Sequence, residues 1–259
     1  HGRLSYTVGN LTPPYGIGLI IDPLAALMLL LISVVALLAT CAALPSVQRE
    51  QAGKEHLFFT LYLILIAGLM GLVMTGDAFN LYVLLEISAL TGYALIALGD
   101  NRALVASFNY VILGTIGASF YLLGVGYLYL LTGTLNMAHI ATYLPGLQGS
   151  AALATALAFI LVGLWIKMAF FPLHGWLPRA YSDAPDGAGL LIAPLMTKVT
   201  IYLMIRLMLT FQSPGFPLIS MEVGTLIVWA AAIGIICASS LALGQRKLNQ
   251  MLTYIIIAE

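Results

Sequence analysis

Long apolar runs, separated by short polar stretches, make up most of the chain. A membrane-spanning helix needs about 20 apolar residues in a row, whereas a transmembrane strand needs about 10 in an alternating pattern. The runs are too long for strands and do not alternate, so the pattern predicts helices that cross a membrane. We expect an all-α, polytopic membrane helix bundle with about seven full spans and the start of an eighth. The predicted spans cover residues 17–44, 56–74, 79–98, 103–131, 151–171, 188–211 and 221–243, and a last one begins at 247.

The polar stretches predict loops, and two prolines predict interruptions of the helices. Residues 1–10 have the composition of a loop, and the loop 132–150 contains a short interfacial helix at about 136–143. Pro172 breaks the fifth run, and a short continuation reaches Tyr181. Proline removes a backbone hydrogen bond and frees a carbonyl, and such breaks are tolerated at membrane depth beside protein-buried or wet cavities. We therefore expect a broken, lysine-bearing helix around Lys167 and Pro172.

The composition places the chain in the membrane class. Its 259 residues are 61% hydrophobic and 8% charged, where a soluble domain carries about 25% charged residues. The formal net charge is zero, which gives no reason to expect a nucleic-acid partner. Cys41 and Cys237 lie far apart in apolar runs, and neither metal-ligand spacing nor a cofactor motif is present. The chain begins on a polar stretch and stops within an apolar run, so we expect a fragment of a longer protein.

Basic residues in the loops predict the orientation, because Lys and Arg are enriched on the cytoplasmic side. Most of the basic loop residues fall on the side of the membrane opposite the N-terminal segment. The loops on the same side as the N-terminal segment contain only Arg3. We expect the N-terminal end outside, in a bacterial plasma (inner) membrane, with Arg206 reaching toward the outer surface. The basic residues of the predicted cytoplasmic loops are Arg49, Lys54, Arg102, Arg179, Arg246 and Lys247.

Three ionisable residues lie inside predicted spans, where charges are costly and need partners. Glu86 lies near the centre of the third span, Lys167 late in the fifth and Lys198 ten residues into the sixth. The glutamate either ties helices together or acts as a proton site paired with a lysine, and the buried lysines favour the second interpretation. Burial favours a neutral lysine and a nearby carboxylate favours a charged one, so Glu86 could load or release a proton on Lys167. Snorkelling to the interface is the alternative for Lys167.

Four further residues are candidates for accessory roles. His174 titrates near neutral pH and either passes protons or makes a hydrogen bond across helices. Tyr202 shares a helix face with Lys198 and Arg206, which makes a polar seam. Asp77 precedes the third span, and Asp183 lies with Asp186 in the turn before the sixth. Helix capping is the simpler role for these aspartates, with proton uptake as the alternative for Asp183.

Four segments of the chain carry a family resemblance. TGDAFNLYVLLEISALTGYALIA, IKMAFFPLHGWLPRAYSDAP, LIAPLMTKVTIYLMIR and QRKLNQMLTY resemble the antiporter-like subunits of respiratory complex I and of Mrp-type monovalent cation/proton antiporters. Among members, the chain looks most similar to the D subunit of the Mrp-type antiporters. The resemblance extends over essentially the whole chain and implies about fourteen helices in full-length members, built round two inverted five-helix repeats.

The resemblance also implies roles for single residues. Glu86 matches the glutamate of the family's Glu–Lys pair, Lys167 its lysine, Lys198 the bridging lysine, and His174 the histidine after the break. The chain is then one partial transmembrane domain whose first repeat covers approximately 56–211, and the proton-relay residues of the second repeat lie outside the chain. Two loop positions depart from the family pattern, because Gln245–Arg246 and His139 stand where relatives often carry an acid.

Three functional hypotheses remain open at this stage. The first is a proton-translocating antiporter-like subunit, with protons, sodium, the lipid bilayer and other membrane subunits as partners. The second is a proton-pumping membrane subunit of a complex I-type NADH:quinone oxidoreductase, and the third is a non-transporting structural fragment. We expect no cofactor and no redox chemistry on this chain itself, since it carries no cofactor motif.

Overall fold

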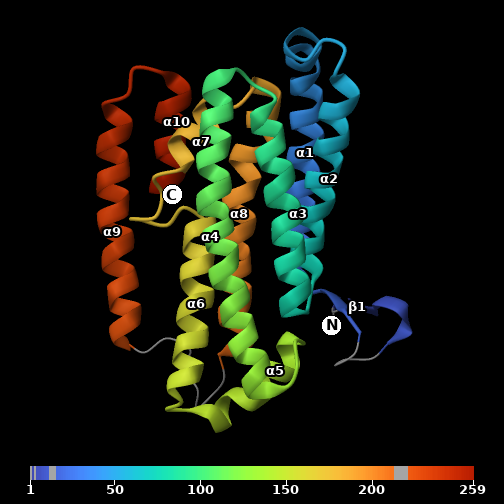
Figure 1. Cartoon of the computed structure of the whole chain (residues 1–259), viewed down its shortest axis with the longest axis vertical. Coiled ribbons are helices and arrows are strands. Elements are labelled where there is room, and N and C mark those ends of the chain that lie inside the picture. Colours follow the sequence, from blue (N-terminus) through green and yellow to red (C-terminus); the bar gives the residue numbers. More distant parts are fainter. Residues whose placement is uncertain (1, 3, 12–15, 213–220) are drawn as a thin grey trace.

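The computed structural model describes residues 2, 4–11, 16–212 and 221–259, and of residues 221–223 only the backbone. Its described part is a bundle of long helices with a small hairpin at one end (Figure 1). The helices are α1 (Pro23–Glu50), α2 (Glu55–Met74), α3 (Ala78–Ala97), α4 (Asn101–Thr132), α5 (Met137–Tyr143), α6 (Ala151–Lys167), α7 (Leu177–Ser182), α8 (Asp186–Phe211), α9 (Met221–Leu243) and α10 (Leu248–Ala258). Two short 3₁₀ turns, η1 (Val8–Asn10) and η2 (Leu144–Leu147), and strands β1 (Leu4–Thr7) and β2 (Gly18–Ile21) complete the described elements.

The start of the chain differs from the expectation. Strands β1 and β2 pair antiparallel, with Leu4 opposite Ile21 and Thr7 opposite Gly18. The predicted loop at 1–10 therefore contains a strand, and the first helix begins at Pro23 rather than near residue 17. Asp22 determines this start, because its side chain accepts a hydrogen bond from the backbone N–H of Ala25 at 2.9 Å.

Side-chain caps also fix the start of several other helices. Asp77, Asp100, Asn136 and Ser150 accept hydrogen bonds from backbone N–H groups in the first turns of α3, α4, α5 and α6. These residue types are the preferred N-caps because their short side chains reach the free N–H groups of the first turn. The short helix predicted within the loop at 132–150 is present as α5, immediately after its cap.

By length and composition, six helices of the described chain could cross a membrane. They are α1, α2, α3, α4, α8 and the Gly224–Leu243 part of α9, while α6 and α10 are apolar but shorter. The expected fifth span is thus shorter than predicted, because its helix ends at Lys167 instead of continuing to Phe171. In Figure 1, α6 occupies the lower half of the bundle and α7 the upper half, with a non-helical segment between them.

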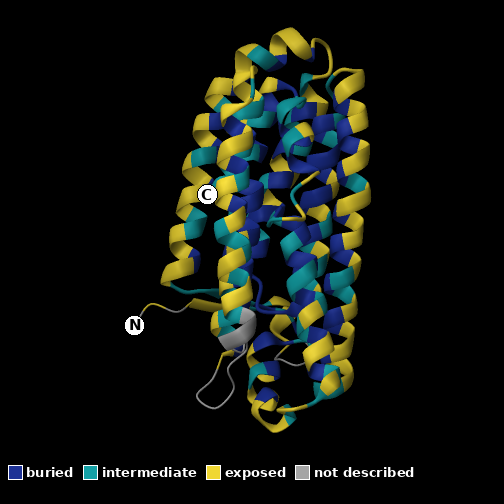
Figure 2. Ribbon diagram, turned by 90° about the vertical axis from the view of Figure 1, so that its left-hand side faces the viewer, coloured by how far each residue is buried: buried dark blue, intermediate teal, exposed yellow. Residues whose placement is uncertain are grey.

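Glycines allow α4 and α6 to approach closely. A Cβ atom on Gly163 of α6 would lie 2.6 Å from the carbonyl oxygen of Gly117, and one on Gly124 would lie 2.6 Å from that of Ala156. Small residues at such interfaces let backbones pack directly against each other in membranes. Figure 2 shows that buried residues face the inside of the bundle while exposed, largely apolar residues cover its outer faces. This distribution is typical of a bundle whose outer surface meets lipid.

Candidate functional site

An ion pair between α3 and α6 lies at the centre of the candidate site. The Nζ atom of Lys167 donates to Oε1 of Glu86 at 3.1 Å, although the two residues are 81 positions apart in the sequence. The side chain of Lys167 is 5% exposed and that of Glu86 is 22% exposed. A charge at this depth requires a partner of opposite charge, and each residue provides one for the other. The sequence left Lys167 and Lys198 as possible partners of Glu86, and in the structure the partner is Lys167.

The end of α6 at Lys167 follows from a Schellman motif. The N–H of Phe170 donates to the carbonyl of Trp165 at 2.9 Å, and the N–H of Ala169 donates to that of Ile166 at 3.2 Å. The rings of Trp165 and Phe170 stack at 5.2 Å, which is the hydrophobic contact that accompanies this motif. Ala169 occupies the left-handed position with φ of 57°, where glycine is the usual residue. The helix therefore stops before Pro172, and the lysine lies in its last turn.

A cluster of four aromatic residues connects α3, the helix of Glu86, to the end of α6, and sequence reasoning did not identify it. Tyr110 of α4 stacks on Trp176 with ring centroids 4.0 Å apart and an angle of 5°, and contacts Tyr93 of α3 edge-on at 4.5 Å. Trp176 also meets Tyr181 of α7 edge-on at 6.0 Å. Each ring is buried. The one sequence signal was the presence of polar aromatics in apolar runs, since such side chains need hydrogen-bond partners when buried.

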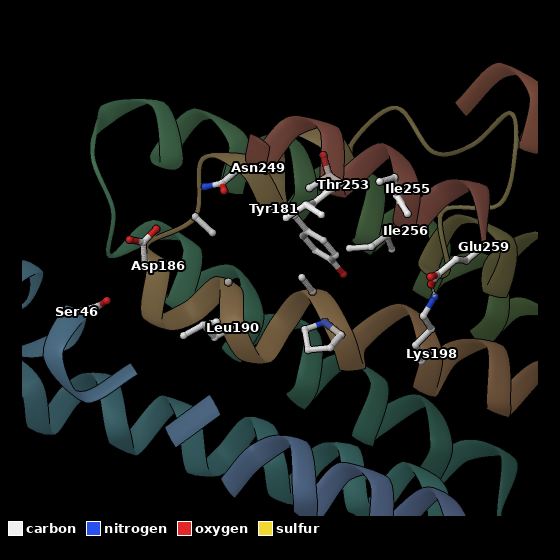
Figure 3. A pocket seen from close by; sticks show the side chains of 15 residues that line it. Ser46, Tyr181, Asp186, Leu190, Lys198, Asn249, Thr253, Ile255, Ile256 and Glu259 are labelled. Carbon is white, nitrogen blue, oxygen red and sulfur yellow. Dashed lines mark hydrogen bonds and ion pairs between the residues drawn. The ribbon is translucent and has the colours of Figure 1, made fainter. Parts of the chain in front are cut away.

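Lys198 lies in a different environment from Lys167. It lies in α8 beside a cavity of about 740 Å³ that α8 and α10 line together. Its Nζ atom lies 2.5 Å from Oε2 of Glu259, and Figure 3 shows these two side chains pointing toward each other at one end of the cavity. Pro194 cannot donate to the carbonyl of Leu190, and both residues line the same cavity. Leu190, Pro194 and Lys198 thus line one cavity.

His174 lies in the segment between α6 and α7, where the sequence placed it after the break. Its ring stacks on Phe171 with centroids 5.4 Å apart, and its Nδ1 atom is buried without a hydrogen-bond partner in the described part of the chain. It lines a second cavity, of about 440 Å³, together with Asn109 and Arg179. The structure places His174 beside this second cavity, whereas Lys198 lines the first.

The polar seam of α8 is present, but each member of it has its own partner. The hydroxyl of Tyr202 donates to the carbonyl of Val73 at 2.9 Å. Arg206 forms an ion pair with Asp22, the cap of α1, and its side chain is 15% exposed. Arg206 therefore reaches toward the expected end of the bundle but ends in a salt bridge rather than at the surface. Sequence reasoning did not identify the pair of Arg206 with Asp22.

Two aspartates at the same end of the bundle, Asp22 and Asp77, have opposite electrostatics. Burial raises the pKa of Asp22, but hydrogen bonds from Ala25 and Arg206 and the charge of Arg206 outweigh it, so the pKa is below 3.8. Burial raises the pKa of Asp77 above 3.8, against the hydrogen bonds that the carboxylate accepts from backbone N–H groups. Asp77 caps α3 through the N–H of Asn80 at 2.7 Å, in keeping with the simpler of its two interpretations.

The turn before α8 differs from the expectation. The N-cap of α8 is Pro185, and no side-chain cap hydrogen bond is present there. Asp183 is instead the last residue of the turn that ends α7, where its backbone N–H donates to the carbonyl of Arg179 at 3.1 Å. Asp186 lies in the first turn of α8 and lines the 740 Å³ cavity. In the described part of the chain, no group of three or more His, Cys, Asp or Glu residues could hold a metal ion.

The fold and the site define a class: a multi-pass membrane protein with a buried carboxylate–lysine pair between its helices. Residues 75–259 match the sequence model of the family described as NADH:quinone oxidoreductase/Mrp antiporter, transmembrane. The chain belongs to this family. The match includes the ion pair, both lysines and His174.

Two curated relatives illustrate the range of the family. The chain is 47% identical to the N subunit of the NADH-quinone oxidoreductase of Desulforudis audaxviator, over 98% of its own length and 50% of the relative. It is 33% identical to the D subunit of the Na(+)/H(+) antiporter of Alkalihalophilus pseudofirmus, over 97% of its own length and 50% of the relative. The expected likeness to an antiporter D subunit is present. Of these two relatives, the oxidoreductase subunit is the more similar to the chain. The chain spans about half the length of these relatives.

Solved structures of multisubunit membrane complexes share the fold. The chain superimposes on a chain of the archaeal membrane-bound sulfane sulfur reductase, a respiratory membrane complex, with a TM-score of 0.89 and 34% identity. This match covers 97% of the chain and 50% of the other. A chain of the Mrp complex from Dietzia sp. DQ12-45-1b matches with a TM-score of 0.81 and 26% identity, over 99% of this chain and 47% of that one. The chain is therefore similar to subunits that work beside other membrane subunits.

Proposed function

We propose that the chain is part of a proton-translocating, antiporter-like membrane subunit in which Glu86, Lys167 and Lys198 relay protons. The observation that carries this proposal is the buried ion pair between Glu86 and Lys167, with 3.1 Å between Nζ and Oε1. Ionisable groups inside membrane proteins are expensive and mark ion pathways or proton relays. His174 and, as accessory residues, Asp77, Tyr202 and Asp183 complete the proposed set.

The proposed relay rests on the competition between burial and the carboxylate. Burial favours the neutral form of Lys167, while the carboxylate of Glu86 favours the charged form. A small separation of the two groups therefore releases a proton, and their approach takes one up. Lys198, beside the 740 Å³ cavity, is the next site along this path. In this proposal α6 and α7 form one broken helix that crosses the plasma membrane, within a first helical repeat at approximately 56–211 and with the N-terminal end outside.

The proposed subunit works within a larger membrane complex. Monovalent cation/proton antiport is the first candidate reaction, supported by the likeness to the D subunit of a Na(+)/H(+) antiporter. Proton pumping in a redox-driven complex is the second candidate. The 47% identity to an N subunit of NADH-quinone oxidoreductase and the TM-score of 0.89 with a respiratory complex favour it. Both candidates use the same pair of residues.

Neutral substitutions in the full-length protein test the proposal. Glu86→Gln and Lys167→Gln each remove one charge of the pair and are expected to reduce proton translocation at least tenfold. The measurement follows acidification of the lumen of membrane vesicles that contain the assembled complex. Glu50→Gln, at the exposed end of α1, is the control and should keep the wild-type rate.

Two further results separate the alternatives. Wild-type rates in both pair variants, with normal assembly, would show that the charges only hold helices together, as expected of a non-transporting scaffold. A sodium gradient that drives proton movement in wild-type vesicles indicates antiport. Proton movement that requires an electron donor indicates a redox-driven complex.

A further inference from the structure

The segment after the break returns to the end of α6 and binds it. The indole N–H of Trp176 donates to the carbonyl oxygen of Ile166 at 3.0 Å, across ten residues of sequence. Ile166 is the residue immediately before Lys167. Its carbonyl already accepts the N–H of Ala169 at 3.2 Å, so it uses both of its lone pairs at this helix end. The backbone that carries Lys167 is thus held from two sides.

The indole ring of Trp176 also packs against α4, the neighbour of the helix that carries Glu86. Trp176 is 3% exposed and stacks flat on Tyr110 of α4, and Tyr110 contacts Tyr93 of α3. Tyr93 lies seven residues after Glu86, two turns along α3. A Cβ on Gly114 would lie 1.8 Å from the hydroxyl oxygen of Tyr93, so only glycine leaves room for this ring. The contacts therefore form a continuous path from the helix of Glu86 to the backbone of Lys167.

We propose that Trp176 is a positioning residue that sets the distance between Glu86 and Lys167 by joining the end of α6 to the aromatic rings of α3 and α4. This inference rests on the proposed function. An ion pair that controls proton loading needs a defined separation, because the interaction energy of two charges varies steeply with distance in a low-dielectric interior. The hydrogen bond of the indole N–H and the stacking of the ring together fix this separation. They act at the C-terminal end of α6, where the helical hydrogen bonds stop.

The titratable groups that face the pair belong to the same cluster. Tyr93 of α3 and Tyr110 of α4 interact electrostatically with Glu86, and Tyr181 of α7 interacts with Tyr110. His174 lies in the segment that carries Trp176. These groups stay in place when only the indole N–H is removed, so a change in the pH profile of such a variant reports on the pair itself.

The test replaces one indole with a ring that lacks the N–H group. Trp176→Phe keeps an aromatic ring for stacking on Tyr110 but cannot donate to Ile166. In the full-length complex in vesicles, we expect the translocation rate to fall at least fivefold and the pH of half-maximal rate to move toward acid by half a unit or more. The direction follows because a looser pair holds the proton on Lys167 less tightly.

Trp165→Phe is the matched control. Trp165 lies in α6, eleven residues away, and its indole N–H is buried without a hydrogen-bond partner in the described part of the chain. Its replacement removes the same group from the same region and should leave the rate within twofold and the pH profile unchanged. An unchanged profile in Trp176→Phe, with or without a lower rate, would overturn the positioning role.

A second variant tests the positioning role of Trp176 if Trp176→Phe does not assemble. Tyr110→Leu keeps the indole N–H and removes the ring under it, so it should produce a smaller acid shift. An unchanged profile in assembled Tyr110→Leu, or failure of both variants to assemble, assigns the tryptophan to folding and rejects the inference. Loss of transport in Glu86→Gln alongside a normal Trp176→Phe rejects this inference alone, whereas normal transport in Glu86→Gln rejects the proposed function.

Discussion

Lys167 and Lys198 come from similar apolar runs, but the structure gives them opposite surroundings. The side chain of Lys167 is 5% exposed, and its helix ends beside a carboxylate that a neighbouring helix holds in place. The side chain of Lys198 is 31% exposed, and it lies in the middle of α8 next to a cavity of about 740 Å³. A lysine in an apolar run is therefore not a single kind of site: Lys167 is preorganised beside its carboxylate, and Lys198 is open to a cavity.

The packing of the neighbouring helices produces the difference. Gly117, Gly124 and Gly163 let α4 and α6 touch backbone to backbone, and the side chain of Lys167 at the end of α6 is buried. Between α8 and α10 the chain instead leaves the large cavity, and the carboxylate of Glu259 meets Lys198 at one end of it. Under the proposed function, Lys167 takes up and releases the proton within the buried pair, and Lys198 receives it beside the cavity.

Removal of each lysine gives the largest expected contrast. Lys167→Met in the full-length protein leaves the carboxylate of Glu86 without its cation, which costs roughly 3–5 kcal/mol for a buried pair. Lys198→Met breaks a pair whose Glu259 side chain is 59% exposed, and such pairs contribute at most about 1 kcal/mol. Thermal unfolding of the purified protein measures both changes.

The double variant Glu86→Gln/Lys167→Met provides the control. It removes both charges and should recover most of the stability lost in Lys167→Met, because no unpaired charge remains. Equal losses in Lys167→Met and Lys198→Met would contradict the distinction between a preorganised and an open lysine.

Much of the fold follows from local sequence signals. Apolar runs of helical length predict most of the helices, and the capping residue Asp77 predicts the start of α3. The sequence also identified Glu86 and the two lysines, because a charge within an apolar run is conspicuous. It could not choose between the lysines as partners for Glu86, since that choice depends on how α3, α4 and α6 pack.

The errors arose from long-range contacts and from one backbone conformation that the local pattern does not predict. Residues 18–21 are apolar enough to extend the first helix, yet they pair with Leu4–Thr7 as a strand. The fifth helix stops at Lys167 because Ala169 adopts a left-handed conformation, which no residue preference indicates for alanine. Arg206 and Asp22 are 184 positions apart, so their pairing could not be deduced from spacing.

The acid stability of two aspartate variants sharpens the comparison, since Asp77 caps the helix of Glu86 and Asp22 anchors the helix of Lys198. The pKa of Asp22 is lowered in the folded protein, so its contribution is present above about pH 3.8 and is lost as the pH falls below it. Asp22→Asn keeps the cap but loses the ion pair with Arg206. It should cost roughly 1.5–3 kcal/mol near neutral pH, and less as the pH falls toward 3.

Asp77→Asn is the control with the opposite sign. The pKa of Asp77 is raised, so its protonated form favours the folded state at low pH, and that gain is lost as the pH rises through the raised value. Its replacement should therefore steepen the acid loss of stability, while Asp22→Asn flattens it. Unfolding midpoints measured between about pH 3 and pH 6 test both signs. Parallel curves for the two variants would contradict the assignment.

The smallest expected effect concerns the helix end that places Lys167. Ala169 has φ of 57°, a conformation that costs an L-residue roughly 1–2 kcal/mol and that glycine adopts freely. Ala169→Gly should therefore stabilise the full-length protein by about 0.5–1 kcal/mol, after the greater freedom of glycine in the unfolded chain is subtracted. Ala154→Gly, at an exposed helical position of the same α6, should destabilise it by about 0.5–1 kcal/mol. Opposite signs in thermal unfolding would show that the end of α6 is held under strain by the Schellman motif and Trp176. A loss of stability in both variants would mean that the helix end carries no such strain and that α6 stops at Lys167 for another reason.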